Sequence, residues 1–243
     1  MAIMNRGAWF IGGGTYTPIL RGTNGQDLES DSDNLGWACF AWKYALVKNG
    51  FRGEMVLDSP VLGDAARTQI KNFQKAHSLA VDGSIGPHTG ERLLRIYFQE
   101  AEQNAFEMPA GTYWQIGAQE SNFDLGAIGW SDTNDRGPVQ THIYVVNGVP
   151  NLTLSQAIRP AYSIPRLGAQ ISRMRENFDL DTAVASWNVG EGGAEWWYKA
   201  GKPISGSPSW WDEEKYGSLA ARCWKYITDV RKHEVPSDYY PNV

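Results

Sequence analysis

Cysteine is scarce in this chain of 243 residues, which has only Cys39 and Cys223. The two lie far apart in the sequence, and neither stands at metal-ligand spacing from another ligand residue. This scarcity argues against a disulfide scaffold or a zinc module as the organising element of the fold. We expect two buried thiols, with a single disulfide between them as the alternative.

Positive charge and long apolar runs are also lacking. Lys and Arg number 22 against 27 Asp and Glu, for a net charge of -5, and no basic cluster stands out. A nucleic-acid partner is therefore not expected. No apolar run approaches the length of a membrane span, and the short apolar start of the chain is broken by Asn5 and Arg6. We expect a protein made in a cytoplasm without a recognisable signal peptide and without membrane insertion.

Metal and cofactor signatures are absent from the sequence as well. None of the four histidines pairs with a carboxylate or a cysteine at ligand spacing: His77, His88, His142 and His233. No glycine-rich phosphate loop and no Ser-His-Asp signature is present. We expect no metal and no cofactor.

Aromatic residues are plentiful, with 11 Trp and 11 Tyr in a chain that is 42% hydrophobic. Flat rings pack on the apolar faces of sugars, and they pack equally well in protein cores. We expect about two thirds of them to be structural, because large aromatic side chains are usually buried. The length of the chain allows one large domain or two small ones.

The first half of the chain predicts three short helices joined by tight turns. Apolar residues recur on one helical face from Trp37 to Val47, before the stop signal Asn49-Gly50. A second helix is expected from about Asp64, with Ala66, Ile70 and Phe73 on its inner face. Turn residues then lead to Pro87, which suits the first turn of a third helix.

These segments resemble the three-helix peptidoglycan-binding domain. The order and spacing match over about forty residues, in Asp64-Ala65-Ala66-Arg67-Thr68, Phe73-Gln74-Lys75 and Val81-Asp82-Gly83-Ser84-Ile85-Gly86-Pro87. The resemblance implies a non-catalytic module that holds fragments of the bacterial wall. A generic small helical bundle is the alternative.

The second half also reads as mainly helical, with almost no strand alternation. Helical spacing is expected around Trp114 to Glu120, from Leu154 to Met174 with interruptions at its prolines, around Ala183 to Trp187, and from Tyr216 to Val230. A polar loop rich in Gly, Asp, Asn and Ser occupies 122–137.

Glu120 is the candidate catalytic acid. It stands at the end of an apolar helix beside the polar loop, the setting in which a carboxyl group can be partly desolvated and still reach a leaving-group oxygen. Three further motifs follow in order along the chain: Gly137-Pro138-Val139-Gln140, Ala185-Ser186-Trp187-Asn188-Val189-Gly190 and Tyr226-Ile227-Thr228-Asp229-Val230.

This ordered set, over about residues 111 to 231, resembles the lytic transglycosylase and goose-type lysozyme superfamily. The resemblance implies Glu120 as the acid, Ser121 beside it, and Gln140, Asn188 and Tyr226 as substrate-binding or supporting groups. Pro138-Val139 stands where the superfamily more usually has Leu-Met, and Trp187 where it commonly has Tyr. Each supporting residue has an alternative role: Gln140 as a bridge between backbone groups, Asn188 as a left-handed helix cap, and Tyr226 as a core ring.

Asp132 is the candidate second carboxylate, because Gly129-Trp130-Ser131-Asp132 resembles the stretch that carries a secondary Asp in goose-type lysozymes. Glycosidases usually need two carboxylates, although substrate-assisted enzymes are exceptions. In the transglycosylase route the acetamido group of the substrate stabilises the anomeric centre, and 1,6-anhydromuramic ends result. Loop capping is the alternative role of Asp132.

Together these observations predict a mainly α protein: a three-helix wall-binding bundle followed by a lysozyme-like domain that is α+β at most. We expect residues 1–98 to form the first domain, with its core at 34–98, residues 99–110 a linker, and residues 111–243 the catalytic domain. The arrangement resembles a bacteriophage endolysin, a monomer that reaches peptidoglycan glycan strands after release from the host cytoplasm. The alternatives are a muramidase assisted by Asp132, an inactive wall-binding virion component, and a bacterial autolysin.

Overall fold

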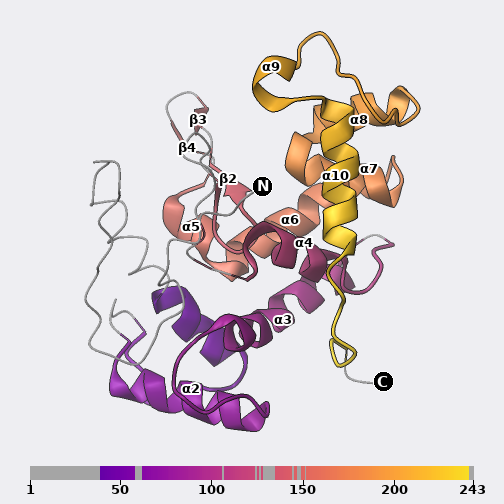
Figure 1. Cartoon of the computed structure of the whole chain (residues 1–243). Coiled ribbons are helices and arrows are strands. Elements are labelled where there is room, and N and C mark those ends of the chain that lie inside the picture. The colour runs from indigo at the N-terminus through magenta and orange to yellow at the C-terminus, as the bar shows by residue number, and fades with distance from the viewer. Residues whose placement is uncertain are drawn as a thin grey trace. The chain divides into compact units, whose positions relative to one another are not determined.

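The computed structural model describes residues 39–57, 62–105, 107–123, 125, 127, 135–143, 145–146, 149–150 and 152–240. Within these ranges the protein is mainly helical (Figure 1), which confirms the predicted mainly α class. The chain is helical over 39–48. The longer helices that follow are α2 (Asp64–Ala76), α3 (Pro87–Gln103), α4 (Thr112–Ser121), α6 (Pro160–Arg175), α7 (Leu180–Val189), α8 (Glu191–Lys199) and α10 (Leu219–Arg231).

The shorter elements are two helical segments and two small hairpins. The helical segments are α5 (Leu154–Ile158) and α9 (Glu213–Tyr216). Strands β1 (Asp135–Arg136) and β2 (Thr141–His142) pair antiparallel, with Arg136 opposite Thr141. Strands β3 (Val145–Val146) and β4 (Val149–Pro150) form the second antiparallel pair.

The chain divides into two compact units. The first combines the described residues up to Tyr97 with Glu120–Ile164, and the second combines Phe98–Gln119 with Pro165–Val243. The predicted linker, 99–110, therefore begins inside α3, which continues to Gln103. The division into a wall-binding module and a catalytic domain stays a prediction.

Apolar faces of the helix at 39–48, α2 and α3 build the N-terminal core of the first unit. The residues predicted for the inner face of α2 are buried, as are Trp42, Leu93 and Leu94. The predicted helix stop is also confirmed, because Gly50 takes a positive φ of 87° directly after the helix. Burial of these apolar side chains is the main force that holds three short helices together.

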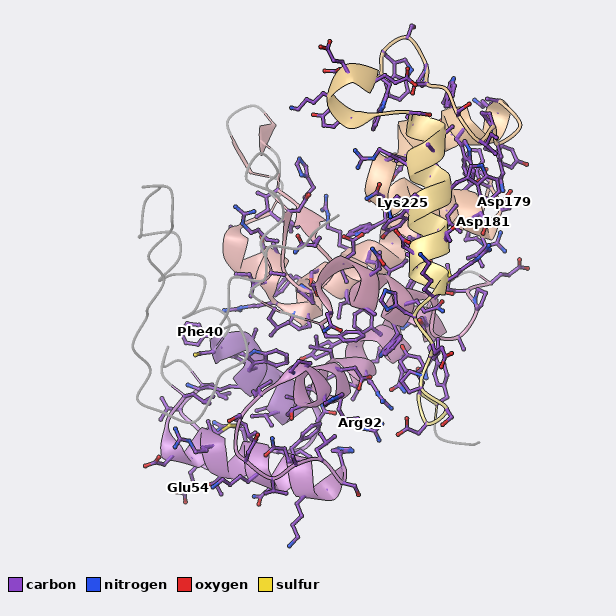
Figure 2. The ribbon with its side chains drawn as sticks, in the orientation of Figure 1. Phe40, Glu54, Arg92, Asp179, Asp181 and Lys225 are labelled. Atoms are coloured by element: carbon purple, nitrogen blue, oxygen red, sulfur yellow. The ribbon has the colours of Figure 1, made fainter. Side chains whose placement is uncertain are left out.

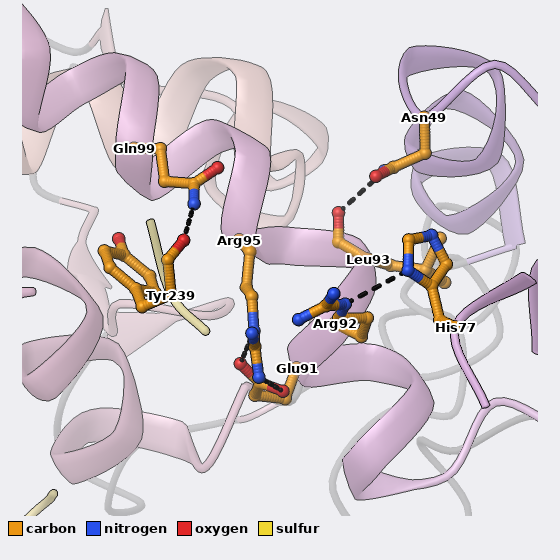
Figure 3. A network of polar contacts seen from close by, with 8 residues as sticks. All are labelled: Asn49, His77, Glu91, Arg92, Leu93, Arg95, Gln99 and Tyr239. Atoms are coloured by element: carbon orange, nitrogen blue, oxygen red, sulfur yellow. Dashed lines mark hydrogen bonds and ion pairs between the residues drawn. The ribbon is translucent and has the colours of Figure 1, made fainter. Parts of the chain in front are cut away.

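Polar side chains join these helices to one another (Figure 3). Asn49 donates from its amide to the carbonyl of Leu93 at 3.0 Å, which ties the end of the first helix to α3. Arg92 of α3 donates to His77 Nδ1 at 3.2 Å, just past the end of α2. These bonds fix how the helices of the small bundle meet.

Gln74 organises the turn between α2 and α3, and it is buried although polar. Its amide nitrogen donates to Asp82 Oδ1 and to the carbonyl of Ser84, both at 2.8 Å. Its carbonyl oxygen accepts from the backbone of Gly83 at 2.9 Å. Hydrogen bonds from the Ser84 backbone and from Gln74 lower the pKa of the Asp82 carboxyl. The motif that resembles the wall-binding family is therefore a hydrogen-bonded turn centred on one buried amide.

Helices α7, α8 and α10 pack together in the second unit. Asp179 and Asp181, labelled in Figure 2, lie at the start of α7. Asp179 caps the helix by accepting from the Thr182 backbone at 3.0 Å, and Asp181 forms an ion pair with Arg231 of α10. The rings of Trp197 and Trp224 pack edge to face, with their centroids 5.2 Å apart. The aromatic and aliphatic contacts make this the tight core of the unit.

Two details of the second half differ from the predicted helices. The predicted interruption at Pro160 is confirmed, because α5 ends at Ile158 and Pro160 opens α6, where its missing N–H is harmless. The predicted interruption at Pro165 is wrong, because Pro165 lies inside α6. The prediction of one helix from Tyr216 to Val230 is wrong at its start. Gly217 takes a φ of 70°, which ends α9 after Tyr216, and Ser218 then caps a new helix by accepting from the Ala221 backbone.

Cys39 and Cys223 are both buried and free, as expected for structural thiols. Burial raises the pKa of Cys223 to about 12, and burial also raises the pKa of Cys39. Neither thiol is therefore activated as a nucleophile. None of the helices in the described part of the chain combines the length and apolar composition that crossing a membrane requires.

Candidate functional site

Helix α4 carries the candidate acid at its C-terminal end. Glu120 is the penultimate residue of the helix and is partly buried. Asn122 and Phe123 follow with φ values of 53° and 66°, so two successive left-handed residues end the helix. Non-glycine residues adopt this conformation at a cost, and such strain is most often found where a side chain must be aimed. The ring of Phe123 is buried, which holds the strained turn in place.

Ser121 joins the end of α4 to the second motif. Its hydroxyl, which is buried, donates to the carbonyl of Pro138 at 2.7 Å across 17 residues of sequence. The Glu-Ser pair and the Gly-Pro-Val-Gln turn, which the resemblance assigns to one site, therefore meet in the first unit. This bond sets the position of Glu120 relative to the turn.

The turn at 137–140 lies between β1 and β2 and needs glycine at its first position. Gly137 has a φ of 80°, and a Cβ there would lie 2.2 Å from the carbonyl oxygen of Ala157. Gln140 has a φ of 50°, and its amide nitrogen donates to the carbonyls of Ala127 and Gly137 at 3.1 and 3.0 Å. The alternative role of Gln140, bridging backbone groups, is thus seen in the structure. A bridged Gln140 is held rigidly beside the motif that carries Ser121.

Asn188 and Tyr226 belong to the second unit, on helices that pack against each other. Asn188 lies inside α7, and its Oδ1 accepts from Arg222 Nη2 of α10 at 3.3 Å. The residue in left-handed geometry is Gly190, with a φ of 76°, so the alternative of Asn188 as the helix cap is wrong. Tyr226 is buried in α10, in keeping with its alternative role as a core ring.

Glu102 fixes the opposite end of α4 and was not among the predicted site residues. Its carboxylate accepts from the backbone N–H groups of Gly111 and Tyr113 at 2.9 and 2.7 Å, and from the Tyr240 hydroxyl at 2.9 Å. A carboxylate at this position satisfies unpaired N–H groups of the first turn and complements the helix dipole. Burial raises the pKa of Glu102, while the three donors oppose that shift.

A weak signal for Glu102 was present in the sequence. Leu94, Phe98 and Glu102 share one face of α3 at a spacing of four residues, so the carboxylate continues an apolar face. A charged residue on such a face indicates a buried partner, but it does not reveal which partner.

His233 fixes α4 at Gln119, again within the second unit. Its Nε2 donates to Gln119 Oε1 at 3.1 Å, and its backbone carbonyl accepts from Gln115 at 2.7 Å. Burial lowers the pKa of His233, and the charge of Asp229 opposes the shift. The residue directly before the candidate acid is thus held by a side chain that the sequence offered only as an isolated histidine.

Asp132 and His142 remain of the residues that the sequence singled out. Asp132 lies outside the described residues, so its predicted role is untested. His142 is exposed, and its Nδ1 lies 2.8 Å from Oδ1 of Asp135 across the β1–β2 pair. Among the described side chains, no cluster of three His, Cys, Asp or Glu residues is placed to hold a metal ion.

The first unit therefore brings together Glu120, Ser121 and Gln140, and the second unit brings Asn188 next to Arg222 on helices that also carry Tyr226. No model of a known protein family matches the chain, and no curated protein matches it.

Proposed function

We propose that this protein degrades bacterial peptidoglycan by cleaving the β-1,4 bond between N-acetylmuramic acid and N-acetylglucosamine, with Glu120 as the catalytic acid. The observation that carries the proposal is the 2.7 Å hydrogen bond from Ser121 to Pro138. It unites the first two of the four ordered motifs around one carboxylate, and the remaining two motifs lie on packed helices of the second unit.

Glu120 suits the role of a general acid. It must give a proton to the glycosidic oxygen as the bond to the anomeric carbon breaks, and a half-buried carboxyl at a helix end can do so while staying accessible. The C-terminal end of a helix carries partial negative charge, which disfavours a second negative charge there and favours the protonated form.

The transglycosylase route follows if the substrate supplies the stabilisation that a second carboxylate would give. The acetamido oxygen stabilises the oxocarbenium-like centre, as in substrate-assisted glycosidases. Glu120, now ionised, takes the proton of the muramic 6-hydroxyl, whose oxygen bonds to the anomeric carbon and closes the 1,6-anhydro ring. Hydrolysis, with a water placed by Asp132, is the alternative outcome of the same first step.

Gln140, Asn188 and Tyr226 act as supporting groups in this proposal. Neutral amides orient hydroxyl and acetamido groups of a sugar without adding charge at the anomeric centre. Gln140 is held by two backbone carbonyls and Asn188 by Arg222. Side chains immobilised in this way bind at a smaller entropic cost than mobile ones.

Residues 34–98 act as the wall-binding module, a role supported by the turn that Gln74 organises. A module that holds insoluble wall raises the local concentration of glycan at the catalytic groups without altering the chemical step. The whole chain then works as an endolysin at the bacterial cell wall.

The test is the clearing of a suspension of purified cell wall by the full-length protein. The wild type is expected to lower turbidity, and Glu120→Gln is expected to be slower by about 100-fold to 10,000-fold with an unchanged melting temperature. Glu176→Gln, which changes an exposed glutamate in the same way, is the matched control and should keep full activity. A wild type that binds wall without clearing it would favour the inactive virion component instead.

A further inference from the structure

The segment between α8 and α10 presents three aromatic side chains that the proposed chemistry does not use. They are Trp210, Trp211 and Tyr216, named here the aromatic platform. Trp210 is 61% exposed and Tyr216 is 42% exposed. Ring centroids lie 6.3 Å apart for Trp210 and Trp211 and 5.5 Å apart for Trp211 and Tyr216. In Figure 1 the segment with α9 lies beyond the N-terminal end of α10.

Hydrogen bonds hold the backbone of the segment that carries the platform, and the ring of Trp211 as well. The Ser218 hydroxyl accepts from the backbone of Gly206 at 2.8 Å and donates to its carbonyl at 3.0 Å. Ser207 accepts from the Leu219 backbone at 2.8 Å, and the indole of Trp211 donates to the carbonyl of Gly217 at 2.7 Å. Rings that are fixed before binding lose little entropy when a ligand covers them.

Two cations lie over these rings. The guanidinium of Arg222 is 5.7 Å from the ring centroid of Trp211 and 5.9 Å from that of Tyr216, and the Lys215 ammonium is 4.9 Å from the Tyr216 ring. Two of the three nearby carboxylates take part in the fold of the segment, and the third, Glu214, is exposed. Asp212 caps α9, and Glu213 accepts from Ser207.

Arg222 also connects the platform to Asn188. The same guanidinium that covers Trp211 and Tyr216 donates to Asn188 Oδ1 at 3.3 Å. All of these residues belong to the second unit. A ligand that reaches Asn188 therefore comes next to fixed aromatic rings and a positive charge.

We infer that the aromatic platform is a subsite for an N-acetylmuramic acid residue of the glycan strand that carries no stem peptide. The apolar face of the pyranose stacks on the exposed ring of Trp210 or Tyr216, and Arg222 attracts the lactyl carboxylate, which is free and charged only when no stem peptide is bound to it as an amide. This inference rests on the proposed function and adds to it a contact that selects a carboxylated sugar. An exposed aromatic group with a cation over it fits an anionic sugar better than an apolar core or a lipid chain.

The test measures binding by full-length protein that carries Glu120→Gln, so that the glycan stays intact. A peptide-free tetrasaccharide of alternating N-acetylglucosamine and N-acetylmuramic acid, named here the muramic tetrasaccharide, and a neutral N-acetylglucosamine tetramer are titrated by calorimetry and tryptophan fluorescence. Trp210→Ala and Tyr216→Ala are each expected to weaken binding of the muramic tetrasaccharide about tenfold, the effect of losing one central aromatic contact. Arg222→Gln should weaken binding of the muramic tetrasaccharide more than binding of the neutral tetramer.

Tyr198→Ala is the matched control, because Tyr198 has the same exposed fraction of 42% in the same unit and lies outside the platform. Equal affinities of Tyr216→Ala, Trp210→Ala and Tyr198→Ala, in a protein whose wild type cleaves wall, would overturn the inference and leave the proposed function standing. A wild type that neither binds nor cleaves peptidoglycan would overturn both. Trp210-dependent binding to vesicles of anionic phospholipid, with no effect of Trp210→Ala on binding of the muramic tetrasaccharide, would assign the platform to a membrane surface and also overturn it.

Discussion

Ser121 is the side chain that determines how the first unit presents Glu120. Its buried hydroxyl donates to the carbonyl of Pro138 and so joins the end of α4 to the turn at 137–140. Replacing Ser121 by Ala leaves the carbonyl of Pro138 without this donor in a buried position. Such a loss typically costs about 1–3 kcal/mol and frees the turn to move.

We therefore predict that Ser121→Ala lowers both the free energy of unfolding and the rate of wall clearing. Ser163→Ala is the control, because Ser163 is also buried and its hydroxyl donates at 3.1 Å to the carbonyl of Arg159, directly before α6. That carbonyl also accepts from the Ser163 backbone, so the control should lose less than about 1 kcal/mol and keep its activity. Similar losses of activity in the two variants, measured by turbidity and urea unfolding, would contradict this account of Ser121.

The residues of the motifs could be singled out from the sequence, but the side chains and backbone groups that they contact could not. Asn188 shows why, because an Asn near a helix end is equally suited to a left-handed cap and to an inward contact. In the structure Gly190 is the residue that ends α7, because glycine adopts a positive φ without the steric cost that a Cβ brings. The partner of Asn188 is Arg222, 34 residues later, and no local pattern in the sequence indicates it.

At the scale of elements, the turn between β1 and β2 depends on the close approach of α5. A Cβ at residue 137 would lie 2.2 Å from the carbonyl oxygen of Ala157, whereas a Cβ at Gly201, with a similar φ of 78°, would meet nothing within 4 Å. The two glycines thus share a backbone conformation and differ in their surroundings.

This difference predicts unequal costs for the same substitution. Gly201→Ala should lower the free energy of unfolding by about 1–2 kcal/mol, because alanine is strained in left-handed backbone geometry. Gly137→Ala should cost about 2–5 kcal/mol, because an overlap with backbone adds to that term. Urea unfolding of both variants measures the difference, and equal costs would show that α5 can move away from the turn.

The helices were predicted well where one apolar face decides the structure. The inner face of α2 and the start of α3 at Pro87 follow from spacing and from turn chemistry. The break at Gly217 was missed because the apolar spacing continues from Tyr216 into α10, and periodicity does not register a single residue of positive φ. The buried roles of Gln74 and Glu102 were missed because their partners lie in turns that only the folded chain brings close.

At the scale of the whole molecule, His233 gives stability a dependence on pH. Its pKa in the folded protein is below its ordinary value of 6.5 because of burial. Between the two pKa values the unfolded chain binds the proton and the folded chain does not, so protonation favours unfolding. The contribution of His233 is complete above 6.5 and is lost as the pH falls through the lowered pKa.

We predict that the free energy of unfolding falls from about pH 8 to about pH 5.5, and that His233→Gln falls less over this range. His88→Gln, at an exposed position, is the control and should follow the wild type. The raised pKa of Glu102 acts in the opposite direction, but it is common to all three proteins and cancels in the comparison. A His233→Gln protein with the same pH dependence as the wild type would contradict the prediction.

Cleavage of glycan strands by Glu120 is tested most directly by mass spectrometry of the products from purified peptidoglycan. The account predicts glycan fragments ending in 1,6-anhydromuramic acid, one water lighter than reducing ends, in the wild-type digest and none in the Glu120→Gln digest. Reducing ends alone, lost in Asp132→Asn as well as in Glu120→Gln, would replace the transglycosylase route by hydrolysis. Intact glycan strands, or fragments that Glu120→Gln releases as fast as the wild type, would contradict the central claim.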